Sequence, residues 1–188
     1  TGDIWAVEEG TIIFPNEPVI TVRANIIEAQ LIETYLLLSI NYQSLIATKT
    51  RRIVEAAKGR AVMEFGSRRA QGESAALLGA RSAYIAGAVG TACAMADVRY
   101  HVPALGTMAH SWVQTFETEY EAFVTYCKTY PTNATLLVDT YNVLKSGIPN
   151  AIKVFDEVLK PLGKRPLGIR IDSGDITYIT KKARKMLD

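Results

Sequence analysis

The chain has 188 residues, of which 48% are hydrophobic and 21% charged, and its net charge is +2. This composition is typical of a globular protein with a buried core, and the small, evenly spread charge excludes an electrostatic case for nucleic acid or an acidic membrane surface. Cys93 and Cys127 lack a CxxC partner or a nearby histidine pair, which argues against a structural zinc site and a disulfide framework. We therefore expect a cytoplasmic protein with free thiols. The uncharged run over residues 82–96 is too short to span a bilayer.

The first part of the chain predicts two strands and a long helix. β-branched residues at 11–14 and 19–22 flank a Pro/Asn turn at 15–18, which favours a pair of short strands. Apolar residues at helical spacing then predict a helix over residues 28–57, with a break or bend near Asn41-Tyr42.

From residue 60 onward the pattern alternates between strands and helices. The apolar runs 62–65, 136–138 and 166–171 are predicted strands, and the segments 72–84, 90–97, 111–126, 148–159 and 176–187 are predicted helices. This order predicts the α/β class, and an α/β barrel is favoured over a doubly wound sheet. The chain starts without methionine inside a strand-like pattern and stops inside a helical one, so we expect a fragment of a longer protein.

Polar residues gather where the predicted strands end. In parallel α/β folds these carboxyl ends face the active site, so the three strand ends and the loop before Ser111 are expected to converge. In Arg170-Ile-Asp172-Ser173-Gly174-Asp175, the guanidinium is suited to phosphate or carboxylate, and Asp172 to sugar hydroxyls. The alternative is that Ser173 or Asp175 simply caps the next helix.

Two further motifs have a functional and a structural interpretation. Phe65-Gly-Ser-Arg68-Arg69 offers an aromatic ring and a guanidinium for a flat anionic ring, or else a core phenylalanine beside solvated arginines. His110 lies in a loop of small residues, where its imidazole is either a nucleophile oriented by Asp139 or a histidine held by ordinary hydrogen bonds at a helix start.

Four segments in order resemble nicotinate phosphoribosyltransferases, and the flanking stretch 146–150 fits as well. They are Glu64-Phe-Gly-Ser-Arg-Arg-Ala-Gln-Gly72, Gly106-Thr-Met-Ala-His-Ser111, Leu137-Val-Asp-Thr-Tyr141 and Gly168-Ile-Arg-Ile-Asp-Ser-Gly-Asp175. The resemblance implies a reaction of NAD salvage, in which nicotinate and phosphoribosyl pyrophosphate give nicotinate mononucleotide and pyrophosphate. It also implies coupling to ATP hydrolysis and Mg²⁺ on the pyrophosphate and ATP.

The resemblance further implies a role for each matching residue. His110 would be phosphorylated by ATP and oriented by Asp139, and Phe65 would stack on the nicotinate ring. The remaining matches would bind substrate: Arg68, Thr107 and Arg170 would contact nicotinate or phosphate, Asp172 would hold the ribose, and Ser173 and Gly174 would shape the turn. Gly90-Thr91-Ala92 replaces a stretch where the related nicotinamide enzyme carries an aspartate, which favours nicotinate.

The family also implies an irregular barrel and a homodimer with shared active sites. On this pattern residues 1–58 would belong to an N-terminal strand and helix domain, and residues 59–188 to part of the barrel. A ring-stacking tyrosine would precede Thr1, and a phosphate-binding loop would follow Asp188. The rival interpretations are a nicotinamide or quinolinate phosphoribosyltransferase of the same fold and a non-catalytic α/β binding module.

Overall fold

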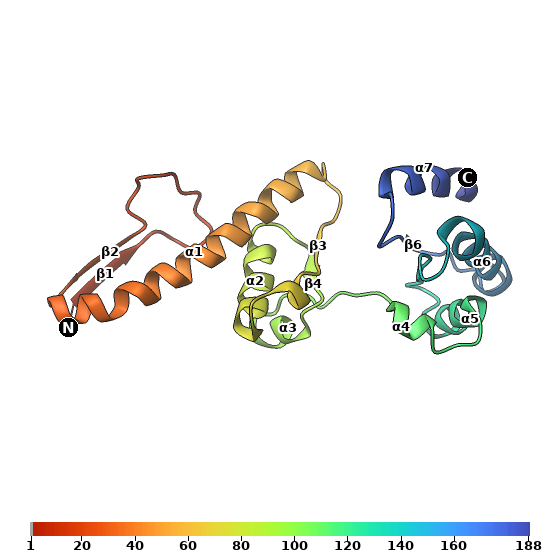
Figure 1. The fold of residues 1–188 in the computed structure, drawn as a ribbon, viewed down its shortest axis with the longest axis horizontal. Helices are drawn as coiled ribbons and strands as arrows, with labels where there is room; N and C mark the ends of the chain where they lie inside the picture. The colour runs from red at the N-terminus through yellow and green to blue at the C-terminus, as the bar shows by residue number, and fades with distance from the viewer. Residues whose placement is uncertain (1) are drawn as a thin grey trace. The chain divides into compact units, whose positions relative to one another are not determined.

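The computed structural model describes residues 2–188, and their contacts divide the chain into two compact units between Gly106 and Thr107. Each unit combines helices with a pair of parallel strands, so the predicted mixture of helix and strand is confirmed (Figure 1). The described residues form three separate two-stranded sheets and no closed sheet. Among these residues no helix is both long and apolar enough to cross a membrane.

The first unit opens with an antiparallel pair, β1 (Gly2–Ala6) and β2 (Ile20–Ala24), followed by the 31-residue helix α1 (Ile26–Ala56). Asn25 caps α1, because its side chain accepts a hydrogen bond from the backbone N–H of Ile27 at 3.4 Å. Of the break or bend expected near Asn41-Tyr42, the break is wrong, since α1 runs through both residues without interruption.

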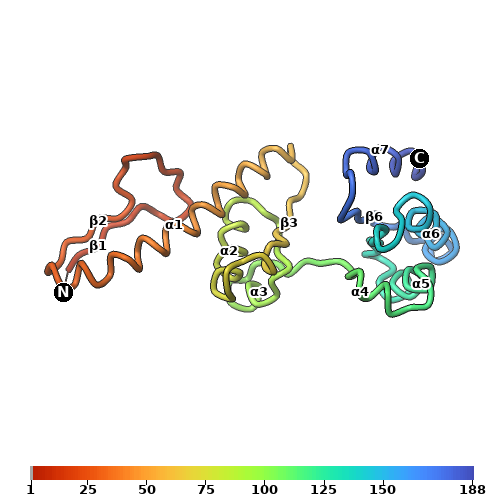
Figure 2. The backbone as a smooth tube through the Cα atoms, viewed as in Figure 1, coloured from red at the N-terminus to blue at the C-terminus, as the bar shows by residue number. Residues whose placement is uncertain are grey.

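The strand expected over residues 11–14 is also wrong. The partner of β2 is β1, and residues 7–19 form a long excursion between the two strands (Figure 2). Within the excursion, backbone groups form hydrogen bonds to nearby residues of the same segment. For example, Phe14 donates its backbone N–H to the Glu17 carboxylate at 3.0 Å. Arg81 then anchors the excursion through a forked pair with Glu9, both contacts at 2.5 Å.

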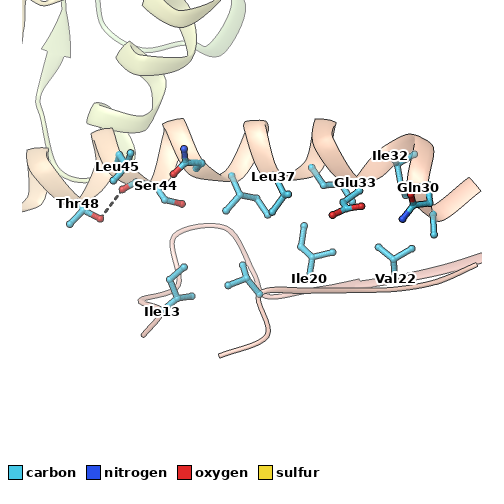
Figure 3. A pocket seen from close by; sticks show the side chains of 15 residues that line it. Ile13, Ile20, Val22, Gln30, Ile32, Glu33, Leu37, Ser44, Leu45 and Thr48 are labelled. Atoms are coloured by element: carbon cyan, nitrogen blue, oxygen red, sulfur yellow. Dashed lines mark hydrogen bonds between the residues drawn. The ribbon is translucent and has the colours of Figure 1, made fainter. Parts of the chain in front are cut away.

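A groove of about 710 Å³ runs between β2 and α1 (Figure 3). Its walls are mainly aliphatic, with Ile20 and Val22 from β2 facing Ile32 and Leu37 from α1. All of its lining residues fall between 13 and 48, so none of the residues predicted to act in chemistry belongs to it.

The rest of the first unit is a small parallel pair wrapped by helices. It comprises β3 (Met63–Glu64), the 3-10 turn η1 (Ser67–Arg69), α2 (Glu73–Ile85), β4 (Gly90–Thr91) and α3 (Ala94–Tyr100). The helix expected from residue 90 is wrong in its first part, because Gly90 and Thr91 pair with Met63 and Glu64. Gly90 has no room for a side chain, since a Cβ would lie 2.5 Å from the carbonyl oxygen of Pro103.

The second unit places parallel strands β5 (Thr135–Leu137) and β6 (Gly168–Arg170) among helices, with Thr135 opposite Gly168. The helices in chain order are α4 (His110–Val113), α5 (Glu119–Thr129), the π-helix η2 (Val143–Gly147), α6 (Ile148–Val154), the π-helix η3 (Phe155–Leu159), the 3-10 turn η4 (Lys160–Leu162) and α7 (Ile176–Leu187). The core between them holds fully buried Phe123, Leu136, Leu137, Ile148 and Leu159.

The single helix predicted over residues 111–126 is wrong, because it is divided into α4 and α5. Thr118 begins α5 as its N-cap, accepting a hydrogen bond from the backbone N–H of Glu121 at 3.2 Å. An N-cap residue is extended rather than helical, so α4 cannot run on into α5.

Candidate active site

The ends of β5 and β6 bring together most of the predicted site residues of the second unit. The ladder continues one step past the strands, where Val138 donates its N–H to the Arg170 carbonyl at 3.1 Å. Asp139 and Asp172 follow on neighbouring strands, and parallel strands end at the same edge of a sheet. The expected convergence of these two carboxyl ends is therefore present.

Asp139 is the best-fixed group of this edge. Its side chain is 1% exposed, and its Oδ2 accepts from the backbone N–H of Asp172 at 3.0 Å and from the Ser173 hydroxyl at 2.6 Å. Its other oxygen, Oδ1, is buried and has no hydrogen-bond partner. Oδ2 thus accepts two hydrogen bonds, whereas Oδ1 is held in a fixed position and accepts none.

His110, the first residue of α4, presents both ring nitrogens to polar groups. Nδ1 lies 3.2 Å from the Thr140 hydroxyl, and Nε2 lies 3.8 Å from Asp139 Oδ1 and 3.6 Å from Asp172 Oδ2. The two longer distances exceed hydrogen-bond range but bring two acidic groups close to one nitrogen. The imidazole is 40% exposed, so a ligand has access to it.

Arg170 joins the same cluster through Asp172 and Thr107. Its Nη2 lies 2.9 Å from Asp172 Oδ2, and its Nη1 donates to the Thr107 hydroxyl at 2.6 Å. The hydrogen bond from Arg170 lowers the pKa of Asp172, and the charges of Arg170 and His110 act in the same direction, against the raising effect of burial. Asp172 is therefore ionised at neutral pH, and its Oδ2 lies between the guanidinium and the imidazole.

The turn after β6 combines capping with support for the site. Asp175 caps α7 by accepting from the Tyr178 N–H at 2.9 Å, so the capping alternative holds for this residue. Ser173 does not cap the helix in this way, because its hydroxyl donates to Asp139. Gly174 has φ +84°, a left-handed conformation that glycine adopts without strain.

Phe65 and Arg68 lie in the first unit, beside the end of β3. Phe65 is 37% exposed, and Arg68 is an exposed residue of η1. Between β3 and β4, the Glu64 carboxylate accepts from the Thr91 hydroxyl at 2.5 Å and from the backbone N–H of Gly66. Thr91 is fully buried, and its hydrogen bond to Glu64 connects the two strands directly before Ala92, the position where the related nicotinamide enzyme carries an aspartate.

The described residues contain no group of three or more histidine, cysteine or acidic side chains that could hold a metal ion. Asp139 and Asp172 are a pair of carboxylates, and Asp172 is already bound to Arg170. A cage made by protein ligands alone therefore does not fit this edge. A magnesium ion would have to arrive on the oxygens of a phosphorylated substrate, which is its common mode of binding.

Thr140 is the residue that sequence reasoning missed, although it lies within the strand-end segment 139–141. Its position directly after Asp139 was the available signal. Glu119 was also missed: it is 5% exposed, and it accepts from Ser146 at 2.5 Å and Asn150 at 3.1 Å. These contacts tie the start of α5 to η2 and α6, the segment that follows Thr140.

Two carboxylates and a guanidinium lie at the ends of parallel strands, with the imidazole of α4 beside them, and α/β proteins commonly bind ligands at this edge of a sheet. Residues 60–187 match the model of the nicotinate phosphoribosyltransferase (NAPRTase) family. Nicotinate phosphoribosyltransferase pncB2 of Mycobacterium tuberculosis is 48% identical in sequence, over 100% of this chain and 40% of its own length. The Bacillus subtilis nicotinate phosphoribosyltransferase is also 48% identical, over 98% of this chain and 37% of its own length.

A solved structure agrees with these sequence relatives. The crystal structure of human nicotinic acid phosphoribosyltransferase matches with a TM-score of 0.87 and 30% identity, over 97% of this chain and 46% of that one. The chain belongs to the nicotinate phosphoribosyltransferase family. It spans about two fifths of the length of the curated relatives it matches.

Proposed function

We propose that the protein containing this chain is a nicotinate phosphoribosyltransferase of NAD salvage. It converts nicotinate and phosphoribosyl pyrophosphate to nicotinate mononucleotide and pyrophosphate, and couples this to hydrolysis of ATP through a phosphohistidine at His110. The observation that carries the proposal is the imidazole of His110 held between the Thr140 hydroxyl and two carboxylates. A non-catalytic module would not need His110 and Asp139 within 3.8 Å of each other.

The surroundings of His110 favour one tautomer. Carboxylates accept hydrogen bonds and do not donate them when ionised, so Asp139 and Asp172 favour the ring proton on Nε2. The lone pair is then on Nδ1, where the Thr140 hydroxyl can donate to it. Asp139 Oδ1, buried and unpartnered, is placed to stabilise the positive charge that the ring gains when Nδ1 is phosphorylated.

Electrostatics also favour Nδ1 as the nucleophile. A phosphoryl oxygen approaching Nε2 would come close to two carboxylates, and like charges 4 Å apart repel by about 4 kcal/mol at an effective dielectric constant near 20. An approach to Nδ1 requires only that the Thr140 hydrogen bond be given up, at a net cost of about 1 kcal/mol. Attack by the Nδ1 lone pair on the γ-phosphorus forms the N–P bond, and ADP leaves with the electrons of the broken P–O bond.

Each of the other predicted residues has a proposed role in binding substrate. Phosphate oxygens suit the guanidinium of Arg170, and ribose hydroxyls suit Asp172, while Phe65 stacks on nicotinate and Arg68 binds its carboxylate. Thr107 positions Arg170, and Ser173 and Gly174 shape the turn. Magnesium, bound with ATP and pyrophosphate, offsets charge on their oxygens when present.

The family pattern extends the proposal to the whole protein. The two parallel strand pairs are part of an irregular α/β barrel, with residues 1–58 in an N-terminal domain and 59–188 in the barrel domain. The active protein is a cytoplasmic homodimer with active sites shared between subunits. Sedimentation of the full-length protein tests the dimer.

The test of function uses the full-length protein and γ-labelled ATP. The wild type should gain an acid-labile, base-stable phosphate, and His110→Ala should not. Nicotinate and phosphoribosyl pyrophosphate should then give nicotinate mononucleotide, while nicotinamide and quinolinate should be poor substrates. Label that persists in His110→Ala would refute the phosphohistidine, and a preference for quinolinate would favour the rival transferase.

A further inference from the structure

We propose that Thr140 is a positioning residue for His110, an inference that rests on the proposed function. Its hydroxyl holds the rotation of the imidazole and favours the tautomer with the lone pair on Nδ1, and it gives up this hydrogen bond when the phosphoryl group arrives. The two carboxylates lie near Nε2, and the Thr140 hydroxyl lies within hydrogen-bond range of the other nitrogen, Nδ1. The 3.2 Å separation between Thr140 Oγ1 and His110 Nδ1 is the geometric basis of the proposal.

A hydroxyl suits this position better than a carboxylate or an amide would. It donates to Nδ1 while the ring is neutral, and it turns to donate to a phosphoryl oxygen once the N–P bond has formed. The hydroxyl carries no charge, so it does not repel the phosphate as an acid would. Thr140 is also β-branched, and a β-branched side chain has few χ1 rotamers, which keeps Oγ1 in place.

The backbone around Thr140 is held on both sides. Before it, Asp139 is fixed by the N–H of Asp172 and the hydroxyl of Ser173. After it, the Asn142 side chain accepts from the Lys145 N–H at 2.9 Å and so caps η2. The Thr140 hydroxyl is therefore presented to His110 from a fixed segment rather than from a loop tip.

The test compares Thr140→Val, which keeps the shape and removes the hydroxyl, with Thr140→Ser, which keeps the hydroxyl. In the full-length protein, single-turnover labelling of His110 by γ-labelled ATP should slow about tenfold in Thr140→Val, because the ring loses the hydroxyl that orients it and the phosphoryl oxygen loses the donor of one hydrogen bond. Thr140→Ser should stay within about twofold of the wild type. Equal rates in Thr140→Val and wild type, or no rescue by serine, would overturn the proposal.

A second measurement needs no variant at position 140. The ¹⁵N NMR spectrum of the imidazole, assigned by its loss in His110→Ala, should show a protonated Nε2 and a hydrogen-bonded, unprotonated Nδ1 at pH 8. A proton on Nδ1 would overturn the role given to Thr140 whether or not the valine variant folds. If the wild type takes no label from ATP while the NMR result holds, the proposed function fails and the orientation of the ring by Thr140 stands.

Discussion

Replacing Gly147 with alanine should destabilise the second unit strongly, although the backbone at this position is ordinary helix. Gly147 has φ −58° and ψ −56°, values that any residue adopts. A Cβ at this position would lie 1.9 Å from the carbonyl oxygen of Val138 and 2.7 Å from its carbonyl carbon. In an open helix the same substitution stabilises by up to about 1 kcal/mol, so the sign of the effect is diagnostic.

The size of the effect follows from what would have to move. The obstructing atoms belong to the backbone of Val138, which is 0% exposed and follows β5 directly. Relief of the contact needs a shift of about 1 Å between η2 and the strand end, where both are packed into the core. Overpacking a core costs roughly 1–3 kcal/mol, and a clash with buried backbone belongs at the upper end of that range.

Urea unfolding of the wild type and of Gly147→Ala, followed by near-ultraviolet circular dichroism, measures this cost. Gly168→Ala is the matched control, because Gly168 lies in β6 of the same unit and a Cβ there would meet no atom within 4 Å. The control should shift stability by less than about 1 kcal/mol. Equal or higher stability of Gly147→Ala would refute the close approach of η2 to Val138. Phosphorylation of His110 should fall with stability, because Val138 directly precedes Asp139.

Three other outcomes are expected. Burial raises the pKa of Cys127 to about 11, so in native protein at pH 8 a thiol reagent should modify the partly exposed Cys93 and spare Cys127 until the protein unfolds. The pKa of Asp172 is lowered by folding, so its ionised form stabilises the protein above the ordinary aspartate pKa of about 3.9, and this contribution is lost as pH falls through the lowered pKa. The difference in melting temperature between wild type and Asp172→Asn should therefore shrink below about pH 4 and stay constant above about pH 5. A difference that is constant throughout would contradict this. Ser173→Ala removes one of two donors to Asp139 Oδ2 and should slow His110 labelling several-fold while the melting temperature changes little, with Gly168→Ala as the unaffected comparison.

Helical periodicity predicted the long helices well. The helices expected over 28–57, 72–84 and 176–187 are present as Ile26–Ala56, Glu73–Ile85 and Ile176–Leu187. Each has a local signal of apolar spacing that needs no knowledge of distant residues.

The failures came from pairing and capping. Residues 11–14 have the composition of a strand, but β2 pairs with β1, and strand pairing depends on distant residues as much as on composition. The division between α4 and α5 had a local signal that was overlooked. Thr118 with Glu121 three residues later is the sequence pattern of a capping box, which marks the start of a helix.

The candidate site could be predicted only to the level of strand ends. His110, Asp139 and Asp172 were nominated because they follow predicted strands or precede a helix, and the second unit places them together. Which hydroxyl faces which nitrogen depends on side-chain directions that no spacing rule gives. The contact of Thr140 with His110 and the hydrogen bond from Ser173 to Asp139 are therefore seen only in the structure.

The π-helix η2 has a consequence for insertions and deletions. A π-helical turn holds one more residue than an α-helical turn, so deleting one residue from Val143–Gly147 would allow an unbroken α-helix into α6. The chain before the deletion would then turn by about 100° relative to α6, carrying Asn142 and Thr140 with it. The 7–19 excursion can accommodate the loss of one residue. The same loss in η2 should separate the Thr140 hydroxyl from His110.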